Sequence, residues 1–334
     1  MAKKKKIASK KYLIGIDIGG TKILAGLLRP DFSVITTEKI KVEPHRGLSI
    51  FIKMLNSLIS ELLSENDLTY KNILAIGVGC PGIIDPETGV VHVSPNLAFL
   101  KQYSLRAALQ KSFHVPVSVE NDVNAGLYGE QQFGAAKNAK HVLGIFLGTG
   151  VGGALIFDGK LYRGFTLAAG EIGHTFMNLP FGLDGGPRPT LENMTGRLAI
   201  ASEAGLLLLK QKAPHLYKDV GTDLKSIKSG ALVRAVKAGD SEIKKLLQSK
   251  AHVLGISMAN AVNLLSPQLI VLGGGLIEAL GHLIVPEADR TMRHYAMPDL
   301  ARPVKVCAAK LGDHAVLLGA AKLAFDLTER KKKK

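Results

Sequence analysis

The chain has 334 residues, of which 46% are hydrophobic and 21% charged, and it contains 36 glycines. This composition excludes a disordered chain, and the length exceeds what one hydrophobic core usually serves, so we expect two lobes. The formal charge is +15, but eleven positive charges lie in residues 1–11 and 330–334, which leaves +4 for residues 12–329. We therefore expect solvated basic tails at 1–11 and 329–334 and no specific nucleic-acid partner.

The two cysteines, Cys80 and Cys307, exclude a disulfide framework, and neither lies in a metal-binding spacing. No long apolar region follows the basic start, because Asp17 and its neighbouring glycines interrupt residues 12–28. No stretch is expected to reach the length of a membrane span. These features predict a cytoplasmic protein without a membrane partner.

The first half of the chain is predicted to open with three strands, at 12–18, 23–28 and 33–40, and a glycine turn separates the first two. Apolar residues at helical spacing predict an amphipathic helix over 48–63, and a buried strand follows at 73–79. Ser104 is placed to cap a helix that runs to Phe113. A strand at 116–120 and a helix at 122–133 complete this half.

The second half repeats the opening pattern, with an apolar strand at 141–147, a glycine-rich turn at 148–153 and a strand at 154–157. Helices are predicted over 191–211, 231–238, 241–265 and 314–327, the last two capped by Asp240 and Asp313, with a strand at 268–272. We interpret the repetition as a duplicated βββαβα plan. It divides the chain into an N-terminal lobe at 12–121 and a larger C-terminal lobe at 122–312, and helix 313–328 returns to the first lobe.

A glycine turn between two strands occurs in each half. The first carries Asp17, Gly19, Gly20, Thr21 and Lys22, and it opens no helix, which excludes a P-loop and a dinucleotide fingerprint. Its glycines let backbone N–H groups approach phosphate oxygens, and Asp17 can hold hydrated Mg²⁺. On this motif alone, a plain hairpin is an equal alternative.

Two further glycine segments strengthen the phosphate interpretation. The second turn contains Gly148, Thr149, Gly150 and Gly152, and the run Gly273-Gly274-Gly275 directly follows a buried strand. Two hairpins of one design suit a single polyphosphate, and a triple glycine allows close approach to a flat adenosine. The three segments together predict binding of ATP.

Polar residues between the predicted strand at 116–120 and the next helix indicate acceptor chemistry. A phosphoryl acceptor hydroxyl needs a carboxylate that orients it and takes its proton, and Asp122 stands at a helix start. The alternative is that Asn121 or Asp122 only caps the helix. Further along, Glu171 and His174, in a glycine-flanked turn, can grip vicinal sugar hydroxyls.

These motifs together resemble the ROK family (repressors, open reading frames and kinases) of the actin-like ATPase superfamily, from Tyr12 to Leu327. The matching segments are IGIDIGGTK, GVGCPGIID, SPNL, VENDVNA, LGTGVGG, GEIGH, LEN and LIVLGGG. The resemblance implies two ribonuclease-H-like α/β lobes with a nucleotide and sugar cleft between them, Mg·ATP as the phosphoryl donor and Asp122 as the catalytic base. It also implies that sugar hydroxyls bind to Asn96, Asn121, Glu171, His174 and Glu192, with backbone help near Gly82.

One segment departs from the family pattern. Relatives usually carry C-x-C-G-x-x-G-C-x-E, whose cysteines bind Zn²⁺ together with the histidine of the GEIGH-type motif. The cysteine positions here hold Leu183, Gly185 and Thr190, so we expect no structural zinc and a His174 oriented by hydrogen bonds. Leu100 stands where many relatives have tryptophan, and Cys80 is expected to pack near the sugar pocket.

The resemblance implies a sugar kinase that forms a homodimer or a tetramer, with the homodimer favoured, and the 6-hydroxyl of glucose as the favoured acceptor. Fructose, mannose and N-acetyl hexosamines remain alternatives, because single hydroxyl contacts decide among them. The family also contains sugar-sensing repressors, which carry a helix-turn-helix module ahead of the kinase-like region. About ten residues precede the first predicted strand here, so we expect no such module. A non-catalytic sugar-binding protein is a further alternative.

Overall fold

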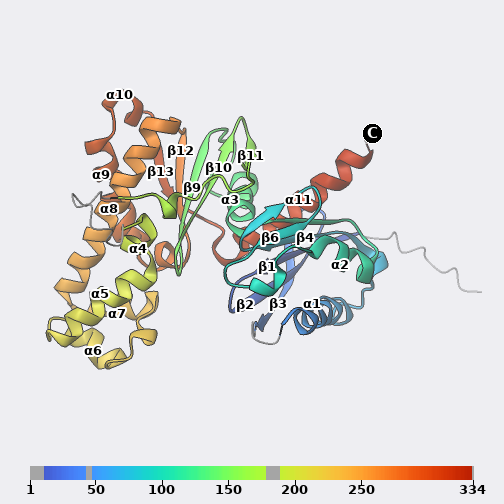
Figure 1. Ribbon diagram of the computed structural model, residues 1–334, viewed down its shortest axis with the longest axis horizontal. Coiled ribbons are helices and arrows are strands. Elements are labelled where there is room, and N and C mark those ends of the chain that lie inside the picture. The colour runs from blue at the N-terminus through green and yellow to red at the C-terminus, as the bar shows by residue number, and fades with distance from the viewer. Residues whose placement is uncertain (1–10, 43–46, 178–188, 333–334) are drawn as a thin grey trace, which may run out of the picture. The chain divides into compact units, whose positions relative to one another are not determined.

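The computed structural model describes residues 11–42, 47–177 and 189–332. The chain forms two compact units. Unit 1 contains Met1–Phe133, Gly164–Ala168 and Asp313–Lys334, and unit 2 contains Gly134–Arg163 and Ala169–Gly312. Each unit is built around its own five-stranded sheet, and Figure 1 labels the elements.

Unit 1 has the sheet order β3-β2-β1-β4-β8. Strand β2 is antiparallel to β1 and β3, whereas β1, β4 and β8 are parallel. The elements of this unit are β1 (Tyr12–Ile18), β2 (Lys22–Leu28), β3 (Val34–Lys41), α1 (Gly47–Ser64), η2 (Tyr70–Asn72), β4 (Ile73–Cys80), β5 (Ile83–Asp85), β6 (Val90–Val93), η3 (Ala98–Leu100), β7 (Tyr103–Ser104), α2 (Leu105–Phe113), β8 (Val117–Asn121), α3 (Asp122–Phe133) and α11 (Ala315–Lys332).

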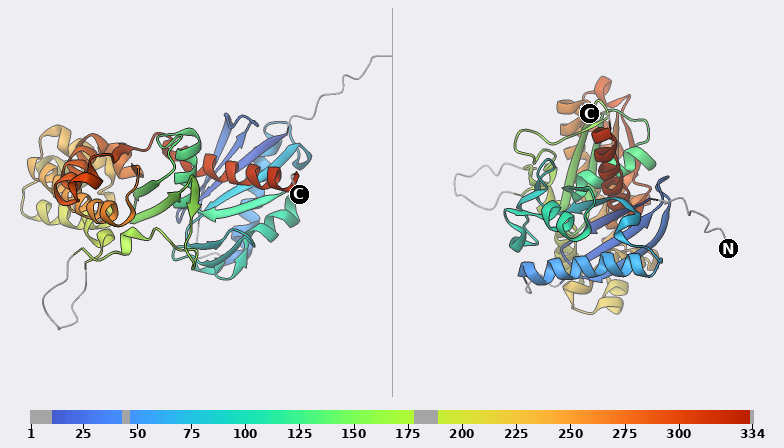
Figure 2. Two further views of the ribbon diagram at one scale, coloured as in Figure 1. Left: turned by 90° about the horizontal axis from the view of Figure 1, so that it is seen from above. Right: turned by 90° about the vertical axis from the view of Figure 1, so that its right-hand side faces the viewer.

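The two faces of the unit 1 sheet are covered in different ways. One face packs its aliphatic side chains against the apolar sides of α1 and α2. The other face carries glycines, and α11 lies directly on it (Figure 2). A Cβ atom at Gly15 would lie 2.2 Å from the carbonyl oxygen of Leu317, and one at Gly77 would lie 1.9 Å from that of Ala320. The backbone of α11 therefore contacts the backbone of β1 and β4, which only glycine permits at these positions.

Helix α3 belongs to unit 1 in the structure, whereas the C-terminal lobe predicted from the sequence starts at residue 122. It packs tightly against α11, because a Cβ at Gly319 would lie 1.8 Å from the carbonyl oxygen of Ala125. The boundary between the units therefore falls after Phe133.

Helix α1 is long and apolar enough to span a membrane by length and composition alone, with a mean hydropathy of 1.3. The expectation that no segment reaches this limit was therefore wrong. Phe51, Leu55, Ile59 and Leu62 nevertheless point from α1 into the core of unit 1. The hydropathy of α1 is thus that of a helix with one buried face.

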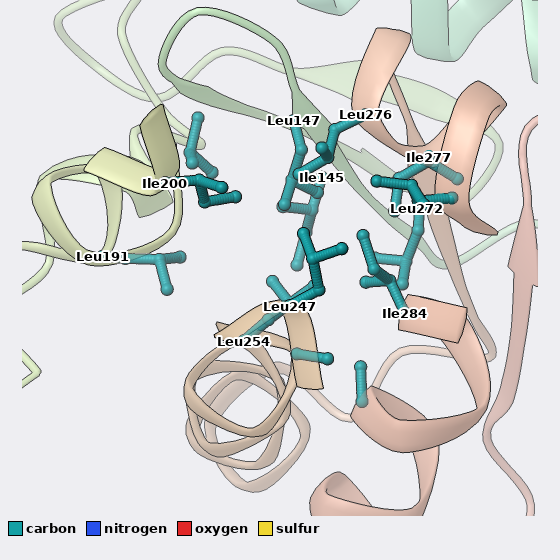
Figure 3. Packing of buried hydrophobic residues seen from close by; sticks show 14 of the residues in the cluster. Ile145, Leu147, Leu191, Ile200, Leu247, Leu254, Leu272, Leu276, Ile277 and Ile284 are labelled. Carbon is teal, nitrogen blue, oxygen red and sulfur yellow. The ribbon is translucent and has the colours of Figure 1, made fainter. Parts of the chain in front are cut away.

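Unit 2 has the sheet order β11-β10-β9-β12-β13, with β9, β12 and β13 parallel. Its elements are β9 (Val142–Leu147), β10 (Val151–Phe157), β11 (Lys160–Tyr162), η4 (Ile172–His174), α4 (Leu191–Thr195), α5 (Arg197–Leu209), α6 (Pro214–Val220), η5 (Leu224–Ser226), α7 (Ser229–Ala238), α8 (Ser241–Leu265), β12 (Leu269–Gly273), α9 (Gly275–Tyr295), α10 (Pro298–Ala301) and β13 (Lys305–Ala308), and η6 (Gly312–His314) leads back to unit 1. Aliphatic side chains from the sheet, α4, α5, α8 and α9 interlock in the core, as Figure 3 shows for Ile145, Leu254 and Leu272.

The equivalent strand orders confirm the predicted duplication and the predicted α/β class. In each sheet three antiparallel strands lie side by side, and two further strands run parallel to the first of them in the chain. The predicted cleft concerns how the units are arranged, and it stays a prediction.

Several local predictions for unit 2 were wrong. The helix predicted at 191–211 is interrupted at Gly196, which adopts an extended conformation between α4 and α5. Asp240 is the N-cap residue of α8, but its carboxylate makes no cap hydrogen bond there. It accepts hydrogen bonds from the backbone N–H groups of His215 (3.2 Å) and Leu216 (2.8 Å), at the start of α6. Helices α6 and α9 and strand β13 were not predicted at all.

Candidate active site

The parallel strands of unit 1 bring the predicted polar residues of that unit to one edge of its sheet. Asp17 on β1 pairs in register with Gly79 on β4, and Cys80 pairs with Asn121 on β8. Asp122 follows immediately as the first residue of α3. Since the carboxyl ends of parallel strands meet at the same edge, residues 105 positions apart in sequence become neighbours in space.

The first glycine turn lies at this edge, next to a predicted sugar ligand. The turn is closed by a hydrogen bond of 2.8 Å from the Gly19 N–H to the carbonyl oxygen of Lys22. A Cβ atom at Gly20 would lie 3.2 Å from Cβ of Asn96. The predicted phosphate turn and one of the predicted sugar-binding side chains are therefore in contact within unit 1.

Asn121 uses part of its amide inside the protein. Its Nδ2 donates to the carbonyl oxygen of Gly82 at 3.0 Å, and its Oδ1 accepts from the Asn124 N–H at 3.0 Å in the first turn of α3. Asn121 therefore caps α3 with its side-chain oxygen. One N–H and one oxygen lone pair of its amide remain for a ligand. Gly82 has a φ of +117°, and a Cβ there would lie 2.0 Å from the Val93 carbonyl oxygen, so this close approach requires glycine.

Glu120 is a supporting residue that the sequence reasoning missed. Its side chain is buried, and its Oε1 accepts from the Asn121 N–H (3.1 Å) and from Nδ2 of Asn124 (3.0 Å). These bonds fix the strand-to-helix turn that presents Asp122. Its position directly before Asn121 in the sequence was the available signal.

The carboxylates at this edge influence one another. Burial raises the pKa of Asp17 to about 7, helped by the negative charges of Asp122 and Asp313 and opposed by Lys22 and Lys39. Because the charged form of Asp17 is costly here, a cation beside it would be favoured.

Cys80 is buried between the strands that carry these carboxylates. Burial, with the charges of Asp122 and Asp17, raises the pKa of its thiol well above the usual value. Since the thiolate is the nucleophilic form, the side chain acts as a packing group, as its sequence context predicted.

Asp313 and Lys39 are further residues at this edge whose place there the sequence did not reveal. The Asp313 carboxylate lies 3.5 Å from Nζ of Lys39 and 3.9 Å from Nζ of Lys22. Asp313 was predicted only as a helix cap, yet it holds two lysines beside the glycine turn. Lys22 therefore faces a carboxylate as well as the turn.

The donor set around Asp17 fits Mg²⁺, which binds through one or two carboxylates and keeps several waters and phosphate oxygens as its other ligands. Within the described residues, no three His, Cys, Asp or Glu side chains gather to form an all-protein metal cage. Of the three positions where relatives carry zinc cysteines, Leu183 and Gly185 lie outside the described residues. Thr190, the third, caps α4 by accepting a hydrogen bond of 3.2 Å from the Asn193 N–H.

Unit 2 brings its own two glycine segments to one edge of its sheet. Strands β9 and β12 are parallel neighbours, and the segments Gly148–Gly153 and Gly273–Gly275 begin where these strands end. Gly274 has a φ of +86°, and a Cβ there would lie 2.5 Å from the Leu147 carbonyl oxygen. Helix α9 starts at Gly275, so its first N–H groups point out at this edge, where they can bind an anion.

Glu192 contacts the second glycine turn directly. Its Oε2 accepts a hydrogen bond of 2.9 Å from the Val151 N–H, and a Cβ at Gly150 would lie 2.0 Å from the same oxygen. The predicted sugar-binding carboxylate is therefore attached to the predicted phosphate turn.

His174 is the last residue of η4, and Glu171 is its N-cap residue. This short helix is fixed against β10, because a Cβ at Gly173 would lie 2.0 Å from the Val151 carbonyl oxygen. The side chains of Glu171 and His174 are mostly exposed, and Nε2 of His174 lies 4.0 Å from Oε2 of Glu171. Within the described part of the chain, the Glu171 carboxylate is the acidic group within ion-pair distance of the His174 imidazole. Glu171 and His174 thus stand side by side, as the prediction of a shared sugar site requires.

The chain is thus an α/β protein of two units with equivalent sheets. Each unit gathers glycine turns and polar residues at the carboxyl edge of its sheet. The profile of the ROK family matches residues 13–326. The chain belongs to the ROK family.

Relatives within this family carry different names. The chain is 29% identical to a glucokinase of Halalkalibacterium halodurans, over 93% of this chain and 94% of that protein. It is 31% identical to an N-acetyl-D-glucosamine kinase of Aliivibrio salmonicida, over 92% of this chain and 97% of that protein. It is also 30% identical to a xylose repressor of Caldicellulosiruptor bescii, over 92% of this chain and 76% of that protein.

The fold is likewise that of a solved family member. A ROK glucokinase from Streptomyces griseus, in complex with glucose and AMPPNP, superposes with a TM-score of 0.81 at 28% identity, and the match covers 94% of this chain and 99% of that one.

Proposed function

We propose that this protein is an ATP-dependent sugar kinase that phosphorylates the 6-hydroxyl of glucose, with Asp122 as the general base. One observation carries the proposal: unit 1 alone places the phosphate turn next to Asn96, and Asp17 close enough to Asp122 for their charges to interact. A phosphoryl donor and an acceptor hydroxyl must be adjacent for in-line transfer, and this edge offers groups for both.

In this mechanism the Asp122 carboxylate accepts a hydrogen bond from the sugar hydroxyl and takes its proton. The hydroxyl oxygen bonds to the γ-phosphorus while the bond from that phosphorus to the β,γ-bridging oxygen breaks, and ADP leaves. The N-terminus of α3 favours the charged form of this carboxylate. Asp17 would hold Mg²⁺ through water, and the bound ion would neutralise charge on the phosphates. Backbone N–H groups of the glycine turns would bind phosphate oxygens without a reorganisation cost.

The proposal keeps the sugar-binding residues that the family resemblance implies. Asn96 and Asn121 would bind sugar hydroxyls in unit 1, and Glu171, His174 and Glu192 in unit 2. Glucose is favoured because relatives named glucokinases match nearly the whole chain, one of them in a complex with glucose. The N-acetyl-D-glucosamine kinase supports an N-acetyl hexosamine as the alternative acceptor. A homodimer, implied by the family resemblance, stays part of the proposal.

A coupled ADP-release assay with Mg·ATP and a panel of hexoses tests this proposal. Glucose, mannose, fructose, glucosamine and the N-acetyl hexosamines are compared at equal concentration. We expect turnover with glucose and a fall in kcat of about 10²–10⁴-fold in Asp122→Asn, because the base is lost while the shape is kept. Asp299→Asn, the same change at an exposed carboxylate paired with Arg302, is the matched control and should keep wild-type turnover.

A second candidate, a sugar-sensing regulator, is favoured by the match to the xylose repressor. Folded protein that turned over none of these sugars would refute the kinase proposal. Sugar-dependent binding to a random DNA library would then support the regulator, and wild-type turnover in Asp122→Asn would refute the assignment of the base alone.

A further inference from the structure

Arg197 is held against the second glycine turn by two contacts. Its Nη2 donates to Oγ1 of Thr149 at 3.1 Å, and its backbone N–H donates to the carbonyl oxygen of Gly148 at 3.2 Å. Gly196, in its extended conformation, directs the first residue of α5 onto this turn. The guanidinium is therefore placed by the backbone as well as by its own side chain.

Arg197 differs from several other arginines in lacking an ion pair among the residues that the structure describes. Several other arginines form ion pairs with a carboxylate, as Arg234 does with Asp219 and Arg290 with Glu287. Among the residues that the structure describes, no carboxylate lies within ion-pair distance of Arg197. A guanidinium has five N–H donors, and Thr149 accepts only one of them, so a fork of donors remains open.

Backbone N–H donors at the start of α5, beside this turn, already have acceptors. The Leu198 N–H, like that of Arg197, is directed to a carbonyl of the turn, in this case Thr149 at 3.4 Å. The start of α5 thus offers these two N–H groups to the turn and not to a ligand. Because Oγ1 of Thr149 accepts from Arg197, its own O–H is free to donate elsewhere. An anion bound at this turn would therefore contact the guanidinium of Arg197 and the hydroxyl of Thr149.

We propose that Arg197 is a phosphate-binding residue that contacts the terminal phosphates of the nucleotide. The assignment rests on the proposed function, because it takes the turn at 148–153 as a nucleotide site. Arginine binds phosphate through paired N–H groups, and such charge-assisted bonds are about twice as strong as neutral ones. The contact would stabilise charge on the transferring group and fix Thr149 at the same time.

Nucleotide binding measured by calorimetry tests the proposal without a sugar. Dissociation constants of Mg·ATP, Mg·ADP and AMP are compared for wild type, Arg197→Ala and Arg197→Lys. We expect Arg197→Ala to weaken Mg·ATP about 10- to 100-fold and to leave AMP unchanged, because AMP lacks the terminal phosphates. Arg197→Lys should lose less, since it keeps the charge but not the fork.

Two further variants separate phosphate binding from a structural role. Arg302→Ala removes an exposed arginine paired with Asp299 and should change no dissociation constant. Thr149→Val removes the hydroxyl that Arg197 contacts. If Arg197 served only to hold this hydroxyl, Thr149→Val and Arg197→Ala would weaken Mg·ATP equally, and the double variant no further, which would overturn the proposal.

Equal losses for ATP and AMP in Arg197→Ala, or Mg·ATP affinity within about twofold of wild type, would also overturn it. Wild type that bound no nucleotide would refute both proposals. Wild type that bound Mg·ATP but phosphorylated no hexose would refute only the proposed function, and the comparison of variants would still decide the role of Arg197.

Discussion

The two units share one strand order but carry different side chains at the carboxyl edge of the sheet. Unit 1 gathers Asp17, Asp122 and Asp313 there, and burial together with the charges of the other two carboxylates raises the pKa of Asp17. Unit 2 gathers glycine segments, a helix N-terminus, the carboxylate of Glu192 and the guanidinium of Arg197, which has no ion-pair partner among the described residues. The shared topology brings a glycine turn to the carboxyl edge of each sheet, and the side chains at the neighbouring strand ends decide what else each edge offers to a ligand.

The units also differ in how a helix covers the sheet. In unit 1 the backbone of α11 rests on glycines of β1 and β4, whereas in unit 2 α8 and α9 pack through interlocking aliphatic side chains (Figure 3). A backbone contact leaves no room for one extra methyl group, but a side-chain contact can adjust by changing rotamers. The same size of substitution should therefore cost more in unit 1.

The largest expected effect follows from this difference. Gly77→Ala should lower the free energy of unfolding by about 3 kcal/mol, because its Cβ would lie 1.9 Å from the Ala320 carbonyl oxygen and α11 would have to move. Gly230→Ala, at an exposed position of α7 where a Cβ would lie 3.4 Å from the flexible end of Arg234, should change it by less than about 1 kcal/mol. Urea unfolding of both variants measures the difference, and equal stabilities would contradict the backbone contact.

The carboxylate edge of unit 1 predicts a pH-dependent effect of intermediate size. The pKa of Asp17 is raised from 3.8 to about 7, so its contribution to stability is complete below pH 4 and is lost as the pH rises through 7. Asp17→Asn removes this loss and should raise the free energy of unfolding by about 2 kcal/mol at pH 8.

Thermal and urea unfolding at pH 4 and pH 8 compare the two proteins. At pH 4 the difference should nearly vanish, and Mg·ATP should stabilise wild type more than the variant. A variant that is no more stable than wild type at pH 8 would show that the charged form of Asp17 costs nothing.

The smallest effect concerns Glu192, whose carboxylate is a predicted sugar ligand and also accepts a hydrogen bond from the second glycine turn. Glu192→Gln keeps an acceptor for the Val151 N–H but loses the charge, so stability should stay within about 0.5 kcal/mol of wild type. The KM for the sugar should rise about tenfold, with a smaller change in the KM for ATP. Steady-state kinetics measure both constants, and Glu242→Gln, at an exposed ion pair with Lys245, is the control. A larger rise in the KM for ATP would make Glu192 a support of the phosphate turn alone.

Local sequence signals predicted the elements whose ends are marked by strong caps or turns. Helix α3 has the predicted bounds, Asp122–Phe133, and Ser104 caps α2 as expected, with a hydrogen bond of 3.2 Å from the Ala107 N–H. Helix α9 was missed because three glycines and an internal Pro286 hide its start and its periodicity. The side chain of Asp240 could be assigned only once α6 was seen beside it, since two helix starts compete for one carboxylate.

The sequence by itself determined the duplicated plan, the glycine turns, the family and the list of candidate residues, because these depend on periodicity and on residues close together in the chain. The tertiary structure decided which residues meet, including some that were not candidates: Asp17 with Asp122, Asp313 with Lys22 and Lys39, and Arg197 with Thr149 across 48 positions. Those pairs follow from strand order and from helices that return across the sheet. The burial of a carboxylate and the ion-pair partners of a guanidinium depend on the surroundings in three dimensions, which no local pattern of residues contains.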